Sequence, residues 1–236
     1  YIEALEQFEL ALEKVELLNE TGMELEILRG LMQANFKADK NRLAMIYGDQ
    51  MINKADGALN YQQVLSLKFE YAAALSHVDK LDIALNLLEE ANILASENDD
   101  SDWVFRINST TGELYLRHEE SKKAKEFFLK AYVHAEHFQL LDDQVRLLSQ
   151  LSAIAVEEGE LEDSIKLTEQ ALEIARTHEH KLMEGQQLVL LALSKNDLEQ
   201  TDAAIEDIQL AVNIFDELKN EQLKEHAQNY LAKFLR

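Results

Sequence analysis

The chain contains no cysteine and no proline, and only seven of its 236 residues are glycine. Without cysteine there is neither a disulfide framework nor a cysteine-based zinc site. The scattered glycines form neither a P-loop nor a dinucleotide-binding fingerprint, which excludes the common phosphate-cradling loops. The absence of cysteine suits both the cytosol and the periplasm. We expect a cytoplasmic protein, and a periplasmic location stays open.

Positive charge and long apolar runs are also scarce. Lysine and arginine number 23 against 45 aspartates and glutamates, which gives a formal net charge of −22. A surface this acidic repels nucleic-acid phosphates and anionic lipids, so we expect no nucleic-acid binding and no direct membrane contact. The longest apolar stretch, Leu188–Leu193, is far shorter than the roughly 18 residues of a membrane span.

Small residues recur with a period of forty, and this is the dominant pattern in the chain. The first set is Ala4, Ala44, Ala84, Ala124, Ser164 and Ala204. The second set lies seven residues further on and is Ala11, Met51, Ala91, Ala131, Ala171 and Ala211. Apolar residues follow helical spacing almost throughout, and strand signals are missing. A fixed period of small residues is typical of a helical repeat protein, in which the same close contact recurs.

Polar breaks divide the chain into about a dozen helices in antiparallel pairs. The short breaks within pairs each offer a polar N-cap to the helix that follows, and they lie at residues 38–41, 78–80, 118–121, 158–160 and 199–201. We expect one array made of a half repeat (1–20), five repeats (21–60, 61–100, 101–140, 141–180 and 181–220) and a half repeat (221–236). The chain opens at Tyr1 and stops in helical pattern, so we expect a fragment of a longer protein.

The second helix of each pair resembles the tetratricopeptide repeat. Ala124, Phe128 and Ala131 match its small-x3-aromatic-x2-small pattern, and Gly112 stands where the preceding helix carries a small residue. The resemblance implies an all-α, right-handed α-α superhelix of antiparallel helix pairs. We expect these residues to pack between helices: Ala84, Ala91, Gly112, Ala124, Phe128, Ala131, Ala171 and Ala211. The chain departs from the family in its forty-residue period, in lacking a closing proline, and in a degenerate pair with Gly48 and Met51.

In such arrays the first helix of each pair lines a concave face. Carrying that register over predicts a ligand-binding set on this face, which is Arg29, Gln33, Arg106, Ser109, Glu113, Arg117, Arg146 and Ser149. Four of the seven arginines fall there. Arginine binds carboxylates with a planar fork of donors, so an anionic peptide or protein is the expected ligand. The alternative is that these arginines neutralise glutamates on adjacent helices.

No catalytic or metal-binding constellation stands out. Nucleophilic catalysis would need a serine or threonine with a paired histidine, and the serines fall on helix faces or caps. We interpret His134, His137, His178 and His180 as exposed polar residues at helix ends rather than zinc ligands. We expect no enzyme activity, no metal and no cofactor.

The resemblance therefore implies a non-catalytic module that binds a protein or peptide. Long repeats of this kind are similar to the sensory or regulatory regions of bacterial signalling proteins, whose effector is a diguanylate cyclase, a kinase or a transcription regulator. The alternative is a structural scaffold that forms a homodimer through apolar faces at its ends, where Leu5, Phe8, Leu231 and Phe234 lie.

Overall fold

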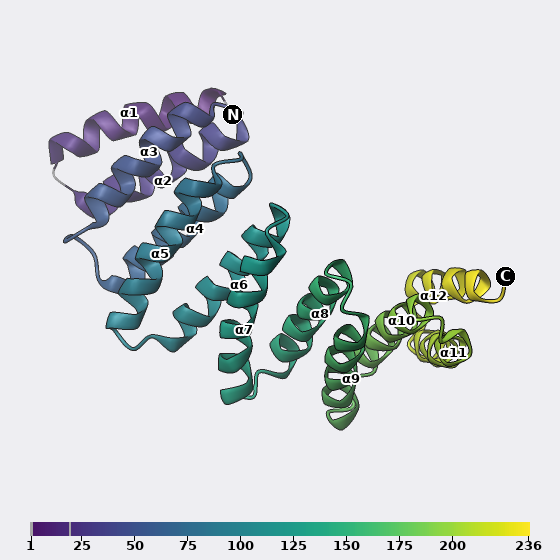
Figure 1. Ribbon diagram of the computed structural model, residues 1–236. Coiled ribbons are helices and arrows are strands. Elements are labelled where there is room, and N and C mark those ends of the chain that lie inside the picture. Colours follow the sequence, from purple (N-terminus) through teal and green to yellow (C-terminus); the bar gives the residue numbers. More distant parts are fainter. Residues whose placement is uncertain (1, 19) are drawn as a thin grey trace. The chain divides into compact units, whose positions relative to one another are not determined.

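The computed structural model describes the backbone of residues 2–18 and 20–236, and the side chains of residues 6–15 and 20–236. These residues form twelve α-helices and no strand (Figure 1). The helices are α1 (Ile2–Leu18), α2 (Thr21–Lys37), α3 (Asn41–Ala55), α4 (Tyr61–Ser76), α5 (Leu81–Glu97), α6 (Ser101–Arg117), α7 (Ser121–His137), α8 (Leu141–Glu157), α9 (Leu161–Thr177), α10 (Lys181–Asp197), α11 (Thr201–Glu217) and α12 (Glu221–Phe234). The predicted all-α fold class is confirmed.

The helices group into two compact units, Tyr1–Leu114 and Tyr115–Arg236. Within the first unit α2 packs on α3, and α4 packs on α3 and α5. Within the second unit each helix from α8 to α11 packs on the helix before it and the helix after it. Each unit buries its own apolar core, because the faces that carry the small residues are covered by neighbouring helices. The forty-residue division into a single array stays a prediction.

Small residues lie at the helix crossings. The packing set is buried throughout: Ala84, Ala91, Gly112, Ala124, Phe128, Ala131, Ala171 and Ala211. Helix axes 8–10 Å apart leave little room for a side chain at the crossing, so alanine and glycine permit the closest approach. The side chains of Ala4 and Leu5 lie outside the described residues.

Two of the repeat positions carry hydroxyl groups instead of alanine or an aromatic ring. Ser164 and Thr168 on α9 are both fully buried. The Oγ of Ser152 on α8 lies 2.9 Å from that of Ser164 and 2.8 Å from the Oγ1 of Thr168, and Ser164 Oγ lies 2.9 Å from Ser194 Oγ on α10. A buried hydroxyl is costly only when it lacks a partner. These four groups are tolerated in the core because they bond to one another across three helices.

The degenerate copy of the repeat has a structural explanation at Gly48. A Cβ atom on Gly48 would lie 2.4 Å from the ring of Tyr71, so the aromatic side chain of α4 fills the space that a large residue on α3 would occupy. Tyr71 is buried, and its hydroxyl lies 3.1 Å from the carbonyl oxygen of Met45 and 2.9 Å from the carboxylate of Asp49. Burial, helped by the bond to Asp49, raises the pKa of this phenol well above its usual value of 10.0. The large side chain that α3 lacks at Gly48 is therefore replaced by Tyr71 of the neighbouring helix α4.

The same tight turn closes nearly every helix, both within and between pairs. One residue per turn adopts the left-handed conformation, and the amide that follows donates to a carbonyl five residues back, as in Leu140 N to Ala135 O (2.8 Å) and His180 N to Ala175 O (2.8 Å). The left-handed residues recur every twenty positions from Asp79 onward: Asp79, Asp99, Glu119, Gln139, Gly159, Glu179, Glu199 and Lys219. This is the Schellman pattern, in which glycine is the usual residue. Successive helices from α5 to α12 accordingly begin twenty residues apart.

The predicted N-caps at the short breaks are wrong. No side-chain cap hydrogen bond comes from the residues before α3, α5, α7, α9 and α11, which are Lys40, Lys80, Glu120, Glu160 and Gln200. Capping occurs at three of the breaks between pairs instead, by Asn60 on Gln63 N (3.0 Å), Asp100 on Trp103 N (3.2 Å) and Asn220 on Leu223 N (3.2 Å). Short Asn and Asp side chains reach the third amide of the helix, whereas Lys, Glu and Gln are too long for this role.

The turns generate a test of stability in which the same change, glutamate to glycine, is made once in a turn and once within a helix. Glu179 has φ 55°, a conformation that disfavours a side chain, so Glu179→Gly should leave stability unchanged or raise it by up to about 1 kcal/mol. Glu173 is exposed within α9, where the same change to glycine should cost about 1 kcal/mol. Urea unfolding followed by circular dichroism measures both. Equal destabilisation by the two variants would contradict the assignment of the turn.

Candidate ligand-binding groove

The second unit contains a cavity of about 590 Å³, formed mainly by α8 and α10. We call it the α8–α10 groove. Its lining residues are Asp142, Asp143, Val145, Arg146, Ser149, Gln150, Met183, Gln186, Gln187, Val189, Leu190, Phe215, Leu223 and His226. A volume of this size matches sites that hold small molecules or short peptide segments.

The apolar part of the groove depends on a close approach between α10 and α11. A Cβ atom on Gly185 would lie 2.6 Å from Cε1 of Phe215, so the glycine lets this ring pack directly against the backbone of α10. Phe215 is almost fully buried and forms part of the groove wall. Val189 and Leu223 add aliphatic surface from α10 and α12. The groove therefore offers apolar contact from three successive helices.

The polar side chains of the groove are bonded to other groups of the same chain. Arg146 Nη2 lies 3.0 Å from Oδ1 of Asp143, one helical turn earlier. The Oγ of Ser149 lies 2.8 Å from the carbonyl oxygen of Val145 and 3.1 Å from Oε1 of Gln187. Such bonds hold the side chains in place before any ligand binds, which reduces the entropy lost on binding.

The predicted ligand-binding residues divide between several surroundings. In the second unit Arg146 and Ser149 line the α8–α10 groove, and Arg117 is exposed at the end of α6. In the first unit Arg106 and Glu113 are exposed. Ser109 is only 5% exposed, so this residue of the predicted ligand-binding set is buried, and its role in binding stays a prediction.

Arg29 and Gln33 converge on one carboxylate. Arg29 places Nε 3.1 Å and Nη2 2.6 Å from the two oxygens of Glu70 on α4, and the Gln33 amide bonds the same side chain. The hydrogen bond that Arg29 donates to Glu70 raises the pKa of Arg29. Both residues also line a second cavity of about 490 Å³ between α1 and α2. Pairing of Arg29 and Arg146 with carboxylates of this chain is what the neutralisation alternative predicts.

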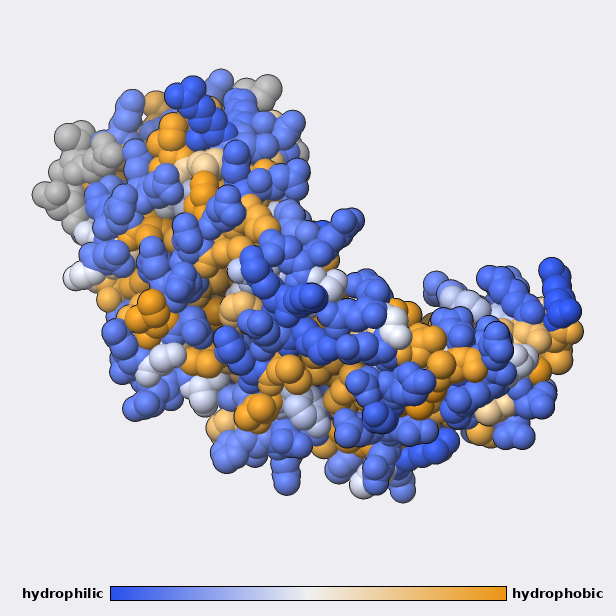
Figure 2. Space-filling model, in the orientation of Figure 1, coloured by the Kyte–Doolittle hydropathy of each residue, from blue (hydrophilic) through white to orange (hydrophobic). Residues whose placement is uncertain are grey.

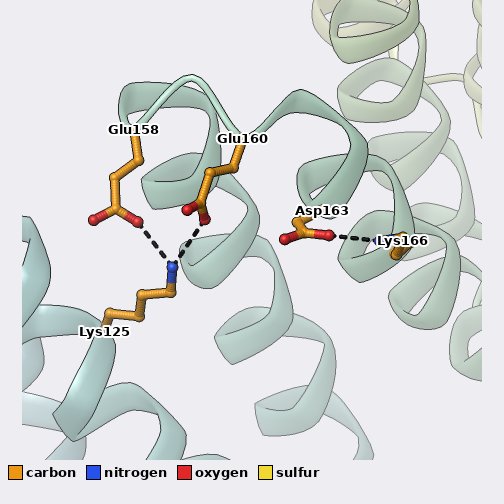
Figure 3. Close-up of polar contacts among 5 residues, drawn as sticks. All are labelled: Lys125, Glu158, Glu160, Asp163 and Lys166. Atoms are coloured by element: carbon orange, nitrogen blue, oxygen red, sulfur yellow. Dashed lines mark hydrogen bonds and ion pairs between the residues drawn. The ribbon is translucent and has the colours of Figure 1, made fainter.

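Ion pairs of the same kind occur on the outer helices of the second unit. Lys125 on α7 reaches Glu158 (2.8 Å) and Glu160 (3.1 Å) in the turn between α8 and α9, and Asp163 pairs with Lys166 at 2.6 Å (Figure 3). The hydrogen bonds that the Lys125 ammonium donates to both glutamates raise the pKa of Lys125 above its usual value of 10.5. Lys125 is thus shared between two carboxylates, whereas Lys166 pairs with one.

Several groove residues were absent from the sequence-based set. Met183, Phe215, Leu223 and His226 line the cavity, and none lies in the concave register predicted from the first helices. The signal that pointed to Phe215 is Gly185, a glycine inside a helix that otherwise favours larger residues. Leu223 and His226 belong to α12, which the predicted repeat boundaries treat as a half repeat.

The remaining surface shows neither a metal site nor a membrane-spanning helix among the residues described. No group of three or more histidines, aspartates or glutamates could hold a metal ion there. No described helix combines the length and the apolar character that crossing a bilayer requires. Hydrophilic residues dominate the face drawn in Figure 2, and hydrophobic residues reach it in scattered patches.

Comparison with known proteins identifies the fold. No protein-family model matches the chain, and no curated protein matches it. Among solved structures it is similar to apo RapI, with a TM-score of 0.73, 15% identity, and coverage of 95% of this chain and 69% of that one. It is also similar to a signal-transduction ATPase with a tetratricopeptide repeat sensor from Pyrococcus horikoshii, with a TM-score of 0.68, 18% identity, and coverage of 95% and 37%. A third match is a Rap protein complexed with competence and sporulation factor, with a TM-score of 0.55, 16% identity, and coverage of 99% and 70%.

Beside the groove, Glu184 is a buried carboxylate whose ionisation contributes to stability. It lies in the first turn of α10, with Arg176 Nε at 2.9 Å and Lys181 Nζ at 2.7 Å. Burial by itself would raise the pKa of Glu184, but the hydrogen bonds from Lys181 and Arg176 outweigh it and lower the pKa below the usual 4.5. The charged form is therefore favoured in the folded state.

This shift predicts the direction of a pH effect. A carboxylate with a lowered folded-state pKa stabilises the fold fully above its unfolded pKa of about 4.5, and the contribution is lost as the pH falls through the folded pKa. Glu184→Gln should lower the thermal midpoint at pH 7 and should flatten its fall below pH 4.5 relative to the original chain. Calorimetry across this range measures both, with exposed Glu173→Gln as the control. Parallel pH profiles for the Glu184 variant and the original chain would contradict the role of this charge.

Twelve helices in tandem, small residues at their crossings, and similarity to tetratricopeptide-type solenoids over nearly the whole length agree: this chain has a tetratricopeptide-type helical repeat fold.

Proposed function

We propose that this chain is a non-catalytic module that binds a peptide in the α8–α10 groove. The observation that carries the proposal is the groove itself, which joins an apolar wall to prearranged polar groups on α8 and α10 of the second unit. A site that combines these features suits a flexible chain with both apolar side chains and backbone amides.

The amide side chains of the groove fit the backbone of an extended peptide. Gln150 and Gln186 each carry a donor and an acceptor, and so can bond to a peptide N–H and C=O together. Val189 and Leu190 on the same helix offer apolar contact to alternate side chains. The groove would thereby recognise both backbone and sequence.

The charge of the groove bears on the ligand it would take. Its charged lining consists of Asp142, Asp143 and Arg146, and the guanidinium is already paired with Asp143. An anionic peptide would meet excess negative charge here, so the groove favours an apolar peptide that is neutral or positively charged. This differs from the anionic ligand expected from the count of arginines alone.

The similar structures suggest a biological setting. One of them is a Rap protein in complex with competence and sporulation factor, and another is a signalling ATPase with a repeat sensor. We propose by analogy that this module is the sensory or regulatory region of a bacterial signalling protein, in which a separate effector domain responds to binding. A homodimeric scaffold stays a second prediction, favoured by the partial exposure of Tyr230, Leu231 and Phe234 on α12.

The groove is tested by the same substitution, valine to glutamate, made at a groove position and at an exposed control position. A phage-displayed library of random peptides, panned on the chain, should enrich related sequences that bind as free synthetic peptides. Val189→Glu places a carboxylate on the apolar wall and should weaken that binding at least about tenfold, because the charge would be desolvated by the ligand. Val133→Glu, at a position on α7 that is 64% exposed, should leave it unchanged.

Calorimetric titration measures both affinities, and circular dichroism checks that each variant is folded. Equal binding by the original chain and the Val189 variant would remove the groove as the site. Failure of the library to enrich any peptide would remove peptide binding as the function.

A further inference from the structure

Arg106 differs from the other arginines of the predicted concave set. Arg29 is held by Glu70 and Arg146 by Asp143. Arg106 is exposed on α6, and among the described side chains no carboxylate lies within ion-pair distance of it.

Two aromatic rings hold this guanidinium instead. Its central carbon lies 4.1 Å from the ring centroid of Trp103, one turn earlier on α6, and 5.2 Å from that of Phe69 on α4. The two rings are themselves in an edge-to-face contact, with centroids 5.6 Å apart and an interplanar angle of 70°. Both aromatic residues are partly buried, so they are anchored in the helix packing yet reach the surface. We call these three residues the Arg106 platform.

Stacking leaves the binding capacity of the guanidinium intact. The rings contact the faces of the planar group, whereas its five N–H donors lie in the plane and point outward at the edges. Glu70, the residue after Phe69, is occupied by Arg29 and Gln33, so its charge is already neutralised. A planar anion can therefore reach the edge of Arg106, and the stacked side chain is held in one orientation before it binds.

We infer that the Arg106 platform binds a carboxylate of a partner peptide, with an apolar side chain of the same peptide against Trp103 and Phe69. A carboxylate matches the fork of donors in both geometry and charge. The exposed parts of the two rings supply apolar contact beside it. All three residues belong to the first unit, so this inference does not rest on the α8–α10 groove of the second unit.

Trp103 is the only tryptophan in the chain, and its fluorescence reports directly on the platform. The probe is an acetylated, amidated pentapeptide, Gly-Leu-Glu-Leu-Gly. The matched control peptide has Gln in place of Glu. A third peptide, with no acidic side chain and a free C-terminus, distinguishes a terminal carboxylate from a side-chain one. We expect a saturable change in Trp103 emission with a carboxylate-bearing peptide and none with the matched control peptide.

The variants separate a binding role from a structural one. Arg106→Gln removes the charge and should weaken the titration about tenfold, and Arg106→Lys should weaken it as well because an ammonium group lacks the planar fork. Arg42→Gln, at an exposed position on α3 of the same unit, should have no effect. Circular dichroism and the thermal midpoint verify that each variant is folded.

Three results would overturn the inference. These are an unchanged titration in Arg106→Gln, an equal response to the Gln-containing peptide, and no saturable response to any carboxylate peptide at millimolar concentration. Val189→Glu should titrate here like the original chain, so failure of the groove and failure of the platform are distinguishable.

Discussion

The structure depends on one recurring contact, the close approach of two helices at a residue too small to hold them apart. Ala84 and Ala91 in the first unit, and Ala131 and Ala171 in the second, have no exposed surface. Because each contact fixes the distance between neighbouring helices, it also fixes which side chains of the first helices lie next to one another. The α8–α10 groove and the Arg106 platform each consist mainly of residues on two alternate helices, α8 with α10 and α4 with α6, brought together in this way.

The fold was predictable from the sequence because its signal is periodic. A small residue every forty positions, combined with apolar stripes at helical spacing, determines the number, order and pairing of the helices. The turns were not predictable in the same way. Eight non-glycine residues adopt positive φ there, so the usual glycine signal is missing, and the N-cap pattern pointed to side chains that are too long to cap.

The candidate site was only partly predictable. The register of the first helices leads to Arg146 and Ser149, which do line the groove. It cannot show that Arg29 is occupied by Glu70 forty-one residues away, or that Ser109 is buried. Ion pairs between repeats depend on side-chain reach rather than on spacing. The contribution of Phe215 likewise depends on Gly185, a residue of another helix.

The central claim concerns the small residues, and Ala131→Leu tests it most directly. Ala131 is fully buried on α7, so the added atoms should separate the helices and lower the free energy of unfolding by about 1–3 kcal/mol. Ala153→Leu, at an exposed position on α8, should change it little. Urea unfolding of both variants supplies the comparison. An Ala131 variant as stable as the original chain would contradict the account, because the helix crossings would then tolerate a large side chain.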